Sequence, residues 1–138
     1  ESDEPSQSHL GTLVKRKVDL WKDLVNINWK VEPSSSEVDR SIAIAAGEVI
    51  EEAMGNAIRH GKATAIDIEL LVTEPAIKIT VTDNGRLDED VSARLIGGGT
   101  GLSMVDIRSS GKWSIERRDE STVLQAMLTM PPSQGLNP

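Results

Sequence analysis

The stretch EEAMGNAIRH, residues 51–60, carries polar side chains at helical spacing within an apolar pattern. Glu52 and Asn56 are four residues apart, so they lie on one face of a helix, one turn apart. Asparagine is a mediocre helix former, because its amide competes for backbone hydrogen bonds. Both residues would emerge at the rim of the core, where a ligand could reach them, although each alone is also explained as a solvated helix position. Cations near a helix C-terminus complement its dipole, and three follow here, namely Arg59, His60 and Lys62.

A second candidate is the aspartate that opens the turn DNG. The alternation of apolar and polar residues that begins at Ile77 reaches Asp83 in phase, so its carboxylate points to the side of the apolar residues. A buried charge is costly unless it is well hydrogen-bonded, and a ligand with an N–H donor would satisfy it. The alternative is that Asp83 only opens the turn, accepting a bond from the backbone two residues on.

The third candidate is the glycine-rich stretch GGGTG, residues 97–101, which directly precedes a predicted helix. Glycines let the backbone approach an anion closely, and a helix N-terminus offers unpaired N–H groups. The stretch is not a Walker loop, because no Lys-Ser or Lys-Thr pair follows, and no parallel strand leads into it as in a dinucleotide fingerprint. Together, the helix, the aspartate and the glycine loop predict one nucleotide site, for metal, base and phosphates respectively.

The elements that must position these residues follow from the apolar spacing. The pattern predicts helices over 10–21, 38–60 and 102–109, and strands over 25–31, 66–72, 77–81, 113–117 and 122–130. Gly61 is the predicted C-terminal stop of the second helix. Tight hairpins favour a mixed, mostly antiparallel sheet, and three helices suffice to cover one face. We therefore predict an α+β fold, a two-layer α/β sandwich.

Composition sets the limits on domain organisation and partners. The 138 residues predict one domain over 10–131, a tail or linker over 1–9 and a C-terminal tail over 132–138. Absence of cysteine excludes disulfides and thiolate metal sites. The net charge of −7 argues against nucleic acid as the main partner. No apolar run approaches the roughly 18 residues of a spanning helix, so we expect no direct membrane contact from this domain. Because the chain opens on Glu1, we expect it to be processed or cut from a longer protein.

Three stretches in order, EEAMGNAIRHGKAT, VTDNG and GGGTGLSMV, resemble the N box and the two glycine boxes of the GHKL ATPases. This superfamily includes sensor histidine kinases, gyrase B, mismatch-repair ATPases and heat-shock chaperones. The resemblance covers residues 38–131 and is greatest to the ATP-binding catalytic domain of bacterial sensor kinases of the nitrate-sensor-like subclass. It implies the Bergerat ATP-binding fold, with ATP and Mg²⁺ as cofactors.

The resemblance also implies roles for individual residues. Asn56 is expected to bind Mg²⁺ through its amide oxygen, and Glu52 to orient or activate the nucleophile or water. Asp83 is expected to accept a hydrogen bond from the adenine amino group, with Gly85 making room for the ring. The other residues expected to contact ATP are His60, Lys62, Gly97, Gly99, Thr100, Gly101, Leu102 and Thr122.

The sequence also departs from the family pattern. Arg86 stands where many relatives have a second glycine, Ser121-Thr122 replaces a Gly-Thr pair, and a phenylalanine box is absent. The only histidine besides His60 is His9, which lacks the acidic neighbour and helical hairpin of a phosphoacceptor. We therefore expect that this chain alone does not autophosphorylate.

The resulting hypothesis is a cytoplasmic ATP-dependent protein kinase, the catalytic domain of a two-component sensor histidine kinase. It would transfer the γ-phosphoryl group to a histidine on a separate dimerisation domain and work with a response regulator. Whether the full-length protein has a membrane anchor is left open. A stand-alone partner-switching protein resembling anti-sigma-factor serine kinases is the alternative, and a degenerate nucleotide-binding module is a third hypothesis.

Overall fold

The computed structural model describes residues 7–73, 75–85 and 102–129, which form a sheet layer and a helix layer. The main sheet has the strand order β2-β4-β5-β7-β6. Its strands are β2 (Asn26–Glu32), β4 (Ala65–Thr73), β5 (Ala76–Asp83), β6 (Trp113–Arg118) and β7 (Ser121–Thr129). The β2–β4 pair is parallel, because a helical crossover joins the two strands, and the other pairs are antiparallel. The predicted mixed, mostly antiparallel sheet is confirmed.

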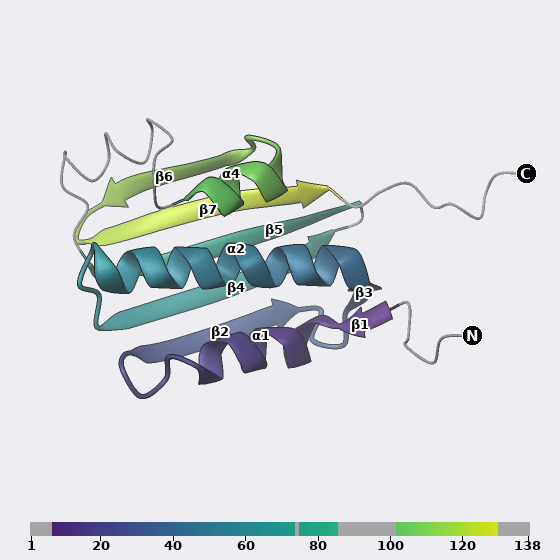
Figure 1. Ribbon diagram of the computed structural model, residues 1–138, viewed down its shortest axis with the longest axis horizontal. Coiled ribbons are helices and arrows are strands. Elements are labelled where there is room, and N and C mark those ends of the chain that lie inside the picture. The colour runs from purple at the N-terminus through teal and green to yellow at the C-terminus, as the bar shows by residue number, and fades with distance from the viewer. Residues whose placement is uncertain (1–6, 74, 86–101, 130–138) are drawn as a thin grey trace, which may run out of the picture.

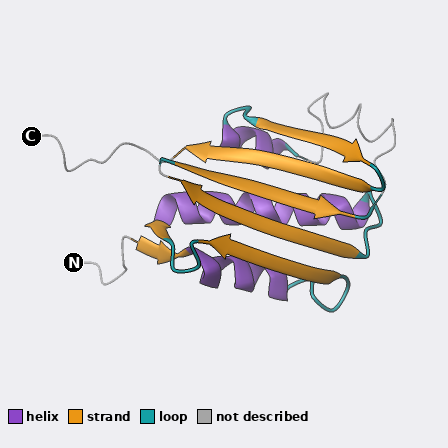
Figure 2. Ribbon diagram, turned by 180° about the vertical axis from the view of Figure 1, so that it is seen from behind, coloured by secondary structure: helices purple, strands orange, loops and turns teal. Residues whose placement is uncertain are grey.

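Three helices in the described residues lie on one face of this sheet (Figure 1). They are α1 (Leu10–Asp19), α2 (Arg40–Arg59) and α4 (Ser103–Ser109). Seen from behind, the strands lie in front of the helices (Figure 2). This arrangement confirms the predicted two-layer α+β sandwich. Within the described residues, the search for a helix long and apolar enough to cross a membrane finds none.

Helix α2 is the central helix and carries two of the candidate residues. Its apolar spacing buries a continuous stripe that includes Ile50 and Met54, both fully inaccessible, against an aliphatic sheet face. The helix ends at Arg59 with His60 as C-cap. The predicted C-terminal stop at Gly61 agrees with this end, and the left-handed residue beyond it is Lys62, with φ 56°. The carbonyl oxygen of Gly61 also makes a close backbone contact, described below.

Two short strands were not predicted. Strand β1 (Gln7–His9) pairs antiparallel with β3 (Glu37–Asp39). Both segments are three residues long, too short to show an alternation. Strand β1 falls in the predicted tail, and Val38 and Asp39 of β3 fall at the start of the predicted helix over 38–60. His9 also caps α1, because its Nδ1 accepts a hydrogen bond from the backbone N–H of Thr12 at 3.2 Å.

Candidate functional site

A row of polar residues crosses three neighbouring strands at one end of the sheet. Asp83 on β5 is the register partner of Thr122 on β7, and Thr122 is the partner of Arg117 on β6. Asp83 and Thr122 are 8% and 5% exposed, respectively, and lie on the helix-covered face. Cross-strand partners have neighbouring side chains, so the row forms one polar cluster at the edge of an apolar core.

Asp83 is the buried acid of this cluster. Its Oδ1 accepts a hydrogen bond from the backbone N–H of Gly85 at 2.7 Å, so the turn role considered from the sequence is present. Burial raises the pKa of Asp83, while the Gly85 bond and the positive charge of Arg117 act in the opposite direction. An ionised carboxylate has about four lone-pair sites, so the turn bond leaves capacity for a ligand donor.

The turn after Asp83 is held by a close backbone contact. A Cβ on Gly85 would lie 2.6 Å from the carbonyl oxygen of Gly61 and 2.9 Å from Asp83 Oδ1, so any side chain here would collide. The Asn84 side chain strengthens this contact, because its Oδ1 accepts a hydrogen bond from the backbone N–H of Thr64 at 2.9 Å. The end of β5 is thereby fixed against the segment that follows α2. The role of Gly85 toward an adenine ring stays a prediction.

Arg117 belongs to the site but was missed in the sequence. Its Nη1 donates to the carbonyl oxygen of Gly85 and, at 3.2 Å, to Thr122 Oγ1. A signal was present: Trp113 and Ile115 alternate on the inner face of β6, and Arg117 continues their phase. A cation on the apolar side of a strand requires a polar partner, and this one lies beside the candidate acid.

Asn56 lies in the last turn of α2 and is 9% exposed. Its Oδ1 is buried and has no hydrogen-bond partner among the residues that the structure describes; Trp21 Nε1 is the other such atom. An unsatisfied buried acceptor costs about 1–3 kcal/mol, so a ligand that supplies a cation or a donor would remove a real penalty. The structure thus explains why an amide at this position favours ligand binding.

Glu52, one turn before Asn56, has a partner within the protein. Its Oε1 accepts a hydrogen bond from the backbone N–H of Val105, in the first turn of α4, at 2.8 Å. The N-cap residue of α4 is Leu102, whose side chain makes no capping bond. Glu52 therefore caps α4 from a different helix, where a negative charge also complements the helix dipole.

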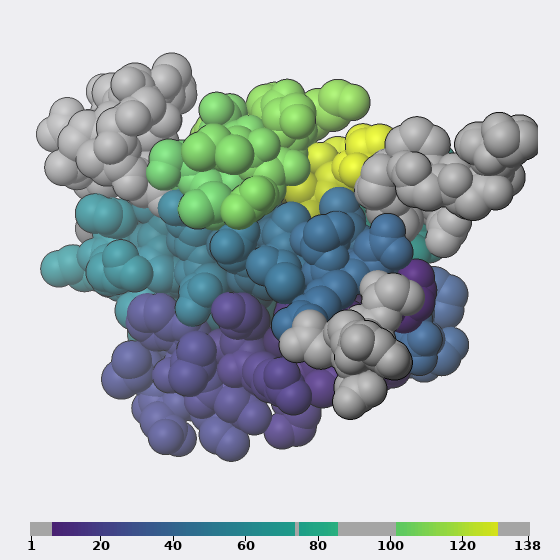
Figure 3. Space-filling model, turned by 45° about the vertical axis from the view of Figure 1, so that its right-hand side comes forward, coloured from purple at the N-terminus to yellow at the C-terminus, as the bar shows by residue number. Residues whose placement is uncertain are grey.

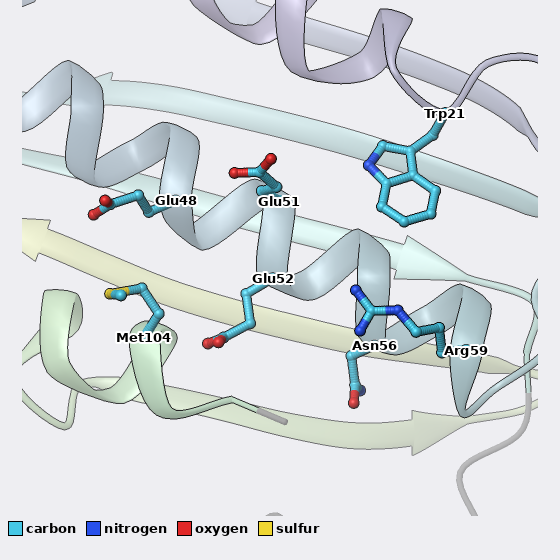
Figure 4. A pocket seen from close by; sticks show the side chains of 7 residues that line it. All are labelled: Trp21, Glu48, Glu51, Glu52, Asn56, Arg59 and Met104. Atoms are coloured by element: carbon cyan, nitrogen blue, oxygen red, sulfur yellow. The ribbon is translucent and has the colours of Figure 1, made fainter. Parts of the chain in front are cut away.

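These two side chains open into a pocket of about 460 Å³ on the outer surface of α2. Figure 4 shows its lining residues, which are Trp21, Glu48, Glu51, Glu52, Asn56, Arg59 and Met104. In this view Glu52 and Asn56 project to the same side of α2, and Glu51 projects to the other. Figure 3 shows the surface of α2 running between the segments of α1 and α4.

Ion pairs hold the walls of the pocket together. Glu48 pairs with Arg108 on α4, with 2.6 Å between Oε1 and Nε. Glu51 pairs with Lys17 on α1, at 3.2 Å. With the Glu52 cap, α2 is connected by acidic side chains to both of its neighbouring helices.

The donor set can be tested against a metal ion. The described residues contain no cluster of three His, Asp or Glu side chains that could hold one. Mg²⁺ does not need such a cage, since it is commonly held by one or two protein oxygens, substrate phosphates and water. The amide oxygen of Asn56, which no described residue pairs with, fits a Mg²⁺–phosphate ligand and does not fit a metal held by protein alone.

The remaining predicted residues are placed as follows. His60 and Lys62 are exposed at the end of α2, close in sequence to Asn56. Leu102 is 3% exposed and packs into the core, so it acts as a packing residue at the start of α4. The glycine loop lies outside the described residues, and this applies to Gly97, Gly99, Thr100 and Gly101.

Comparison with known proteins defines the class. The profile of the histidine kinase-, DNA gyrase B- and HSP90-like ATPases matches residues 42–130, which include most of α2, the turn after β5 and the last hairpin. The chain belongs to this ATPase family. Family membership implies ATP as the nucleotide of the site, in agreement with the resemblance found in the sequence.

Solved histidine kinase structures share the fold. The nucleotide-free catalytic domain of the histidine kinase ThkA is 17% identical, with a TM-score of 0.68 over 91% of this chain and 95% of that one. The histidine kinase domain of the E. coli osmosensor EnvZ is 16% identical, with a TM-score of 0.66 over 99% and 96%. ThkA in complex with the response regulator TrrA is 15% identical, with a TM-score of 0.72 over 93% and 42%.

Proposed function

We propose that this chain is the ATP-binding catalytic domain of a sensor histidine kinase of the nitrate-sensor-like subclass, acting in the cytoplasm. It would transfer the γ-phosphoryl group of ATP to a histidine on a separate dimerisation domain, from which a response regulator receives it. The observation that carries the proposal is the buried Oδ1 of Asn56, which has no partner within the described part of the chain and lines the same pocket as Glu52. Similarity to kinase catalytic domains over nearly their whole length supports it.

The two ends of the nucleotide are assigned to the two ends of the site. Asp83 accepts from the exocyclic amino group of adenine, and Gly85 and Thr122 lie beside it. Asn56 lies on the neighbouring helix. Gly85 lies close to the backbone of Gly61, which follows that helix, and Asn84 binds the backbone of Thr64, so the two segments are held together. The base and the phosphates therefore bind to parts of the protein with a fixed separation, which positions the γ-phosphate.

Asn56 would hold Mg²⁺ through Oδ1, and the ion, when bound, neutralises the charge of the phosphates. Glu52 lies one turn away and orients the attacking imidazole through its carboxylate. Because Glu52 Oε1 also accepts from Val105, the orientation of the carboxylate is fixed in advance. The protein thus contributes positioning and electrostatics rather than covalent chemistry.

Calorimetric titration of Asn56→Ala with ATP, in magnesium and in excess chelator, tests the metal role. In magnesium we expect the affinity for ATP to fall by at least roughly tenfold, which is the loss caused by removing an outer-shell partner of a metal ion. In chelator the variant and the native protein should bind equally, because the contribution of Asn56 acts through the ion. Asn28→Ala, at an exposed position on β2, is the control. Undiminished binding of Asn56→Ala in magnesium would overturn the assignment.

Phosphoryl transfer is tested with the histidine-bearing helical hairpin of the same full-length protein, supplied in trans with γ-labelled ATP. Labelling of the hairpin that is lost in acid and stable in base identifies a phosphohistidine. Acid-stable label on a protein partner would instead identify a serine kinase. ATP binding with no transfer to the hairpin would leave a nucleotide-binding module and contradict the kinase proposal.

A further inference from the structure

We infer that Arg117 is a positioning residue that determines the base specificity of the nucleotide site. The inference rests on the proposed binding of adenine at Asp83 and extends it to a residue outside the three sequence motifs. Arg117 lies on β6, two strands away from Asp83, with Thr122 between them. Arg117 therefore acts on the nucleotide through the shape and charge of the site, without touching the nucleotide itself.

The contacts of Arg117 converge on the turn that carries Asp83. One nitrogen, Nη1, donates both to the Gly85 carbonyl oxygen and to Thr122 Oγ1. Thr122 Oγ1 in turn lies 3.5 Å from the same carbonyl oxygen. Gly85 is thus held on both sides: its N–H donates to Asp83 Oδ1 and its C=O accepts from Arg117. The two bonds restrain the peptide units on either side of the Gly85 Cα, and thereby the Asp83 carboxylate that accepts from one of them.

The charge of Arg117 acts on the same carboxylate. The register partners of Asp83 are Ile66 on β4 and Thr122 on β7, both uncharged, and its Oδ1 accepts from the backbone N–H of Gly85. Among the described residues, Arg117 supplies the charge that acts on it, and this charge lowers the pKa that burial raises. An ionised Asp83 accepts from the amino group of adenine and repels the carbonyl oxygen that guanine presents there.

The neighbouring arginine, Arg118, shows that the contacts of Arg117 depend on its position on β6 and not on its residue type alone. Arg118 lies on the opposite face of β6, and its Nε donates to Glu116 Oε2 at 2.6 Å. It has the same side chain and nearly the same place in the sequence but is not part of the polar row. Arg118 is therefore a matched control for the removal of one positive charge from this strand.

The test compares Arg117→Met, Arg117→Lys and Arg118→Met by competition titration of ATP against GTP. We expect Arg117→Met to weaken ATP binding roughly tenfold, equivalent to about 1.4 kcal/mol, with little change for GTP. Arg117→Lys should recover most of the ATP preference, because it restores the charge. Arg118→Met should match the native protein. An unchanged ATP-to-GTP ratio in Arg117→Met would overturn the inference, as would an equal loss in Arg118→Met.

A second measurement separates this inference from the proposed function. The carboxyl carbon of Asp83 is titrated by NMR without nucleotide, and its midpoint should be higher in Arg117→Met than in the native and Arg118→Met proteins. If the native protein binds no nucleotide, the proposed function fails while the titration still decides the role of Arg117. An Asp83 midpoint that does not move in Arg117→Met would contradict that role. Circular dichroism confirms that each variant is folded.

Discussion

Glu52 on α2 and Val105 on α4 are joined by a hydrogen bond of 2.8 Å from the backbone N–H to the carboxylate. The same carboxylate is the candidate for orienting the phosphoacceptor, so one side chain serves both the structure and the proposed chemistry. Since Leu102 provides no side-chain cap, the position of α4 depends on a residue that lies one turn from Asn56. Substitutions of Glu52 should therefore change two independent quantities, the free energy of unfolding and the rate of phosphoryl transfer.

The structural role predicts a loss of stability in Glu52→Ala. Removal of the carboxylate leaves the first turn of α4 without its cap, and we expect the free energy of unfolding to fall by about 1 kcal/mol. Glu52→Gln keeps an oxygen acceptor for the Val105 N–H, so its free energy of unfolding should fall less. Urea denaturation measures the free energy of unfolding of both variants. Glu51→Ala, which breaks a partly exposed ion pair with Lys17, is the control and should cost less. Equal losses in the two alanine variants would exclude a specific capping role.

The proposed catalytic role predicts that Glu52→Gln slows phosphoryl transfer more than it weakens ATP binding. The amide preserves the bond to Val105 but not the negative charge, so transfer should fall by roughly 10²-fold with a much smaller change in affinity. Transfer kinetics and calorimetry on the same preparation give the two values. A variant that binds ATP several-fold more weakly and transfers at the native rate would show that the assignment is wrong.

Gly85→Ala should destabilise the fold. The new Cβ would meet the Gly61 carbonyl oxygen at 2.6 Å, and neither backbone segment can move without disturbing β5 or the end of α2. We expect a cost of about 1–3 kcal/mol, measured by thermal or urea unfolding. Gly47→Ala is the comparison, because its Cβ would meet the ends of the flexible side chains of Leu13 and Lys17 at 3.0 Å. A smaller loss in Gly85→Ala than in Gly47→Ala would contradict the contact.

Local patterns were sufficient for the strands of the main sheet, though not for their order, and for two parts of the site. The alternation from Ile77 to Asp83 predicted both a strand and the inward direction of the carboxylate, because side chains in a strand point alternately to its two faces. Helical spacing likewise placed Glu52 and Asn56 on one face of α2. These features depend on residues close together in the sequence.

The features that could not be predicted depend on contacts between distant segments. The contact of Gly85 with Gly61 and the cap of α4 by Glu52 join residues that no local pattern relates. The same holds for Arg117 on β6, whose partner Gly85 follows β5 and is 32 residues away in the sequence. Glycine at position 61 indicated a helix stop by its type alone, whereas the need for glycine at position 85 follows from its close approach to the Gly61 carbonyl oxygen.

Lys62 provides a test that separates conformation from charge. It has φ 56°, in the left-handed region that costs a non-glycine residue about 1–2 kcal/mol. Lys62→Gly should therefore be more stable than the native protein, and Lys62→Ala should not be, as thermal unfolding would show. If the ammonium contributes to phosphate binding, both variants should bind ATP more weakly to the same extent. Equal stability of the glycine and alanine variants would contradict the backbone explanation.

The most informative substitution is Asp83→Asn, for which stability and binding should change in opposite directions. Burial raises the pKa of Asp83 above its ordinary value of 3.8, so between these two values the folded state binds more protons than the unfolded state. The free energy of unfolding then falls as the pH rises through this window, and the cost persists above it. Asp83→Asn removes the cost, so the variant should be the more stable protein at neutral pH, with a gain that disappears on acidification.

The binding measurement on Asp83→Asn completes this prediction. The native site should prefer ATP to GTP by roughly 10²-fold, because the carboxylate accepts from the adenine amino group and repels the guanine carbonyl. An amide both donates and accepts, so the variant should bind ATP more weakly and discriminate less. Competition titration at neutral pH, beside urea denaturation from about pH 3 to pH 8, measures both effects. A variant that is less stable than the native protein at neutral pH would show that the Gly85 bond outweighs the burial of the charge. Equal native affinity for ATP and GTP would reduce Asp83 to a turn residue.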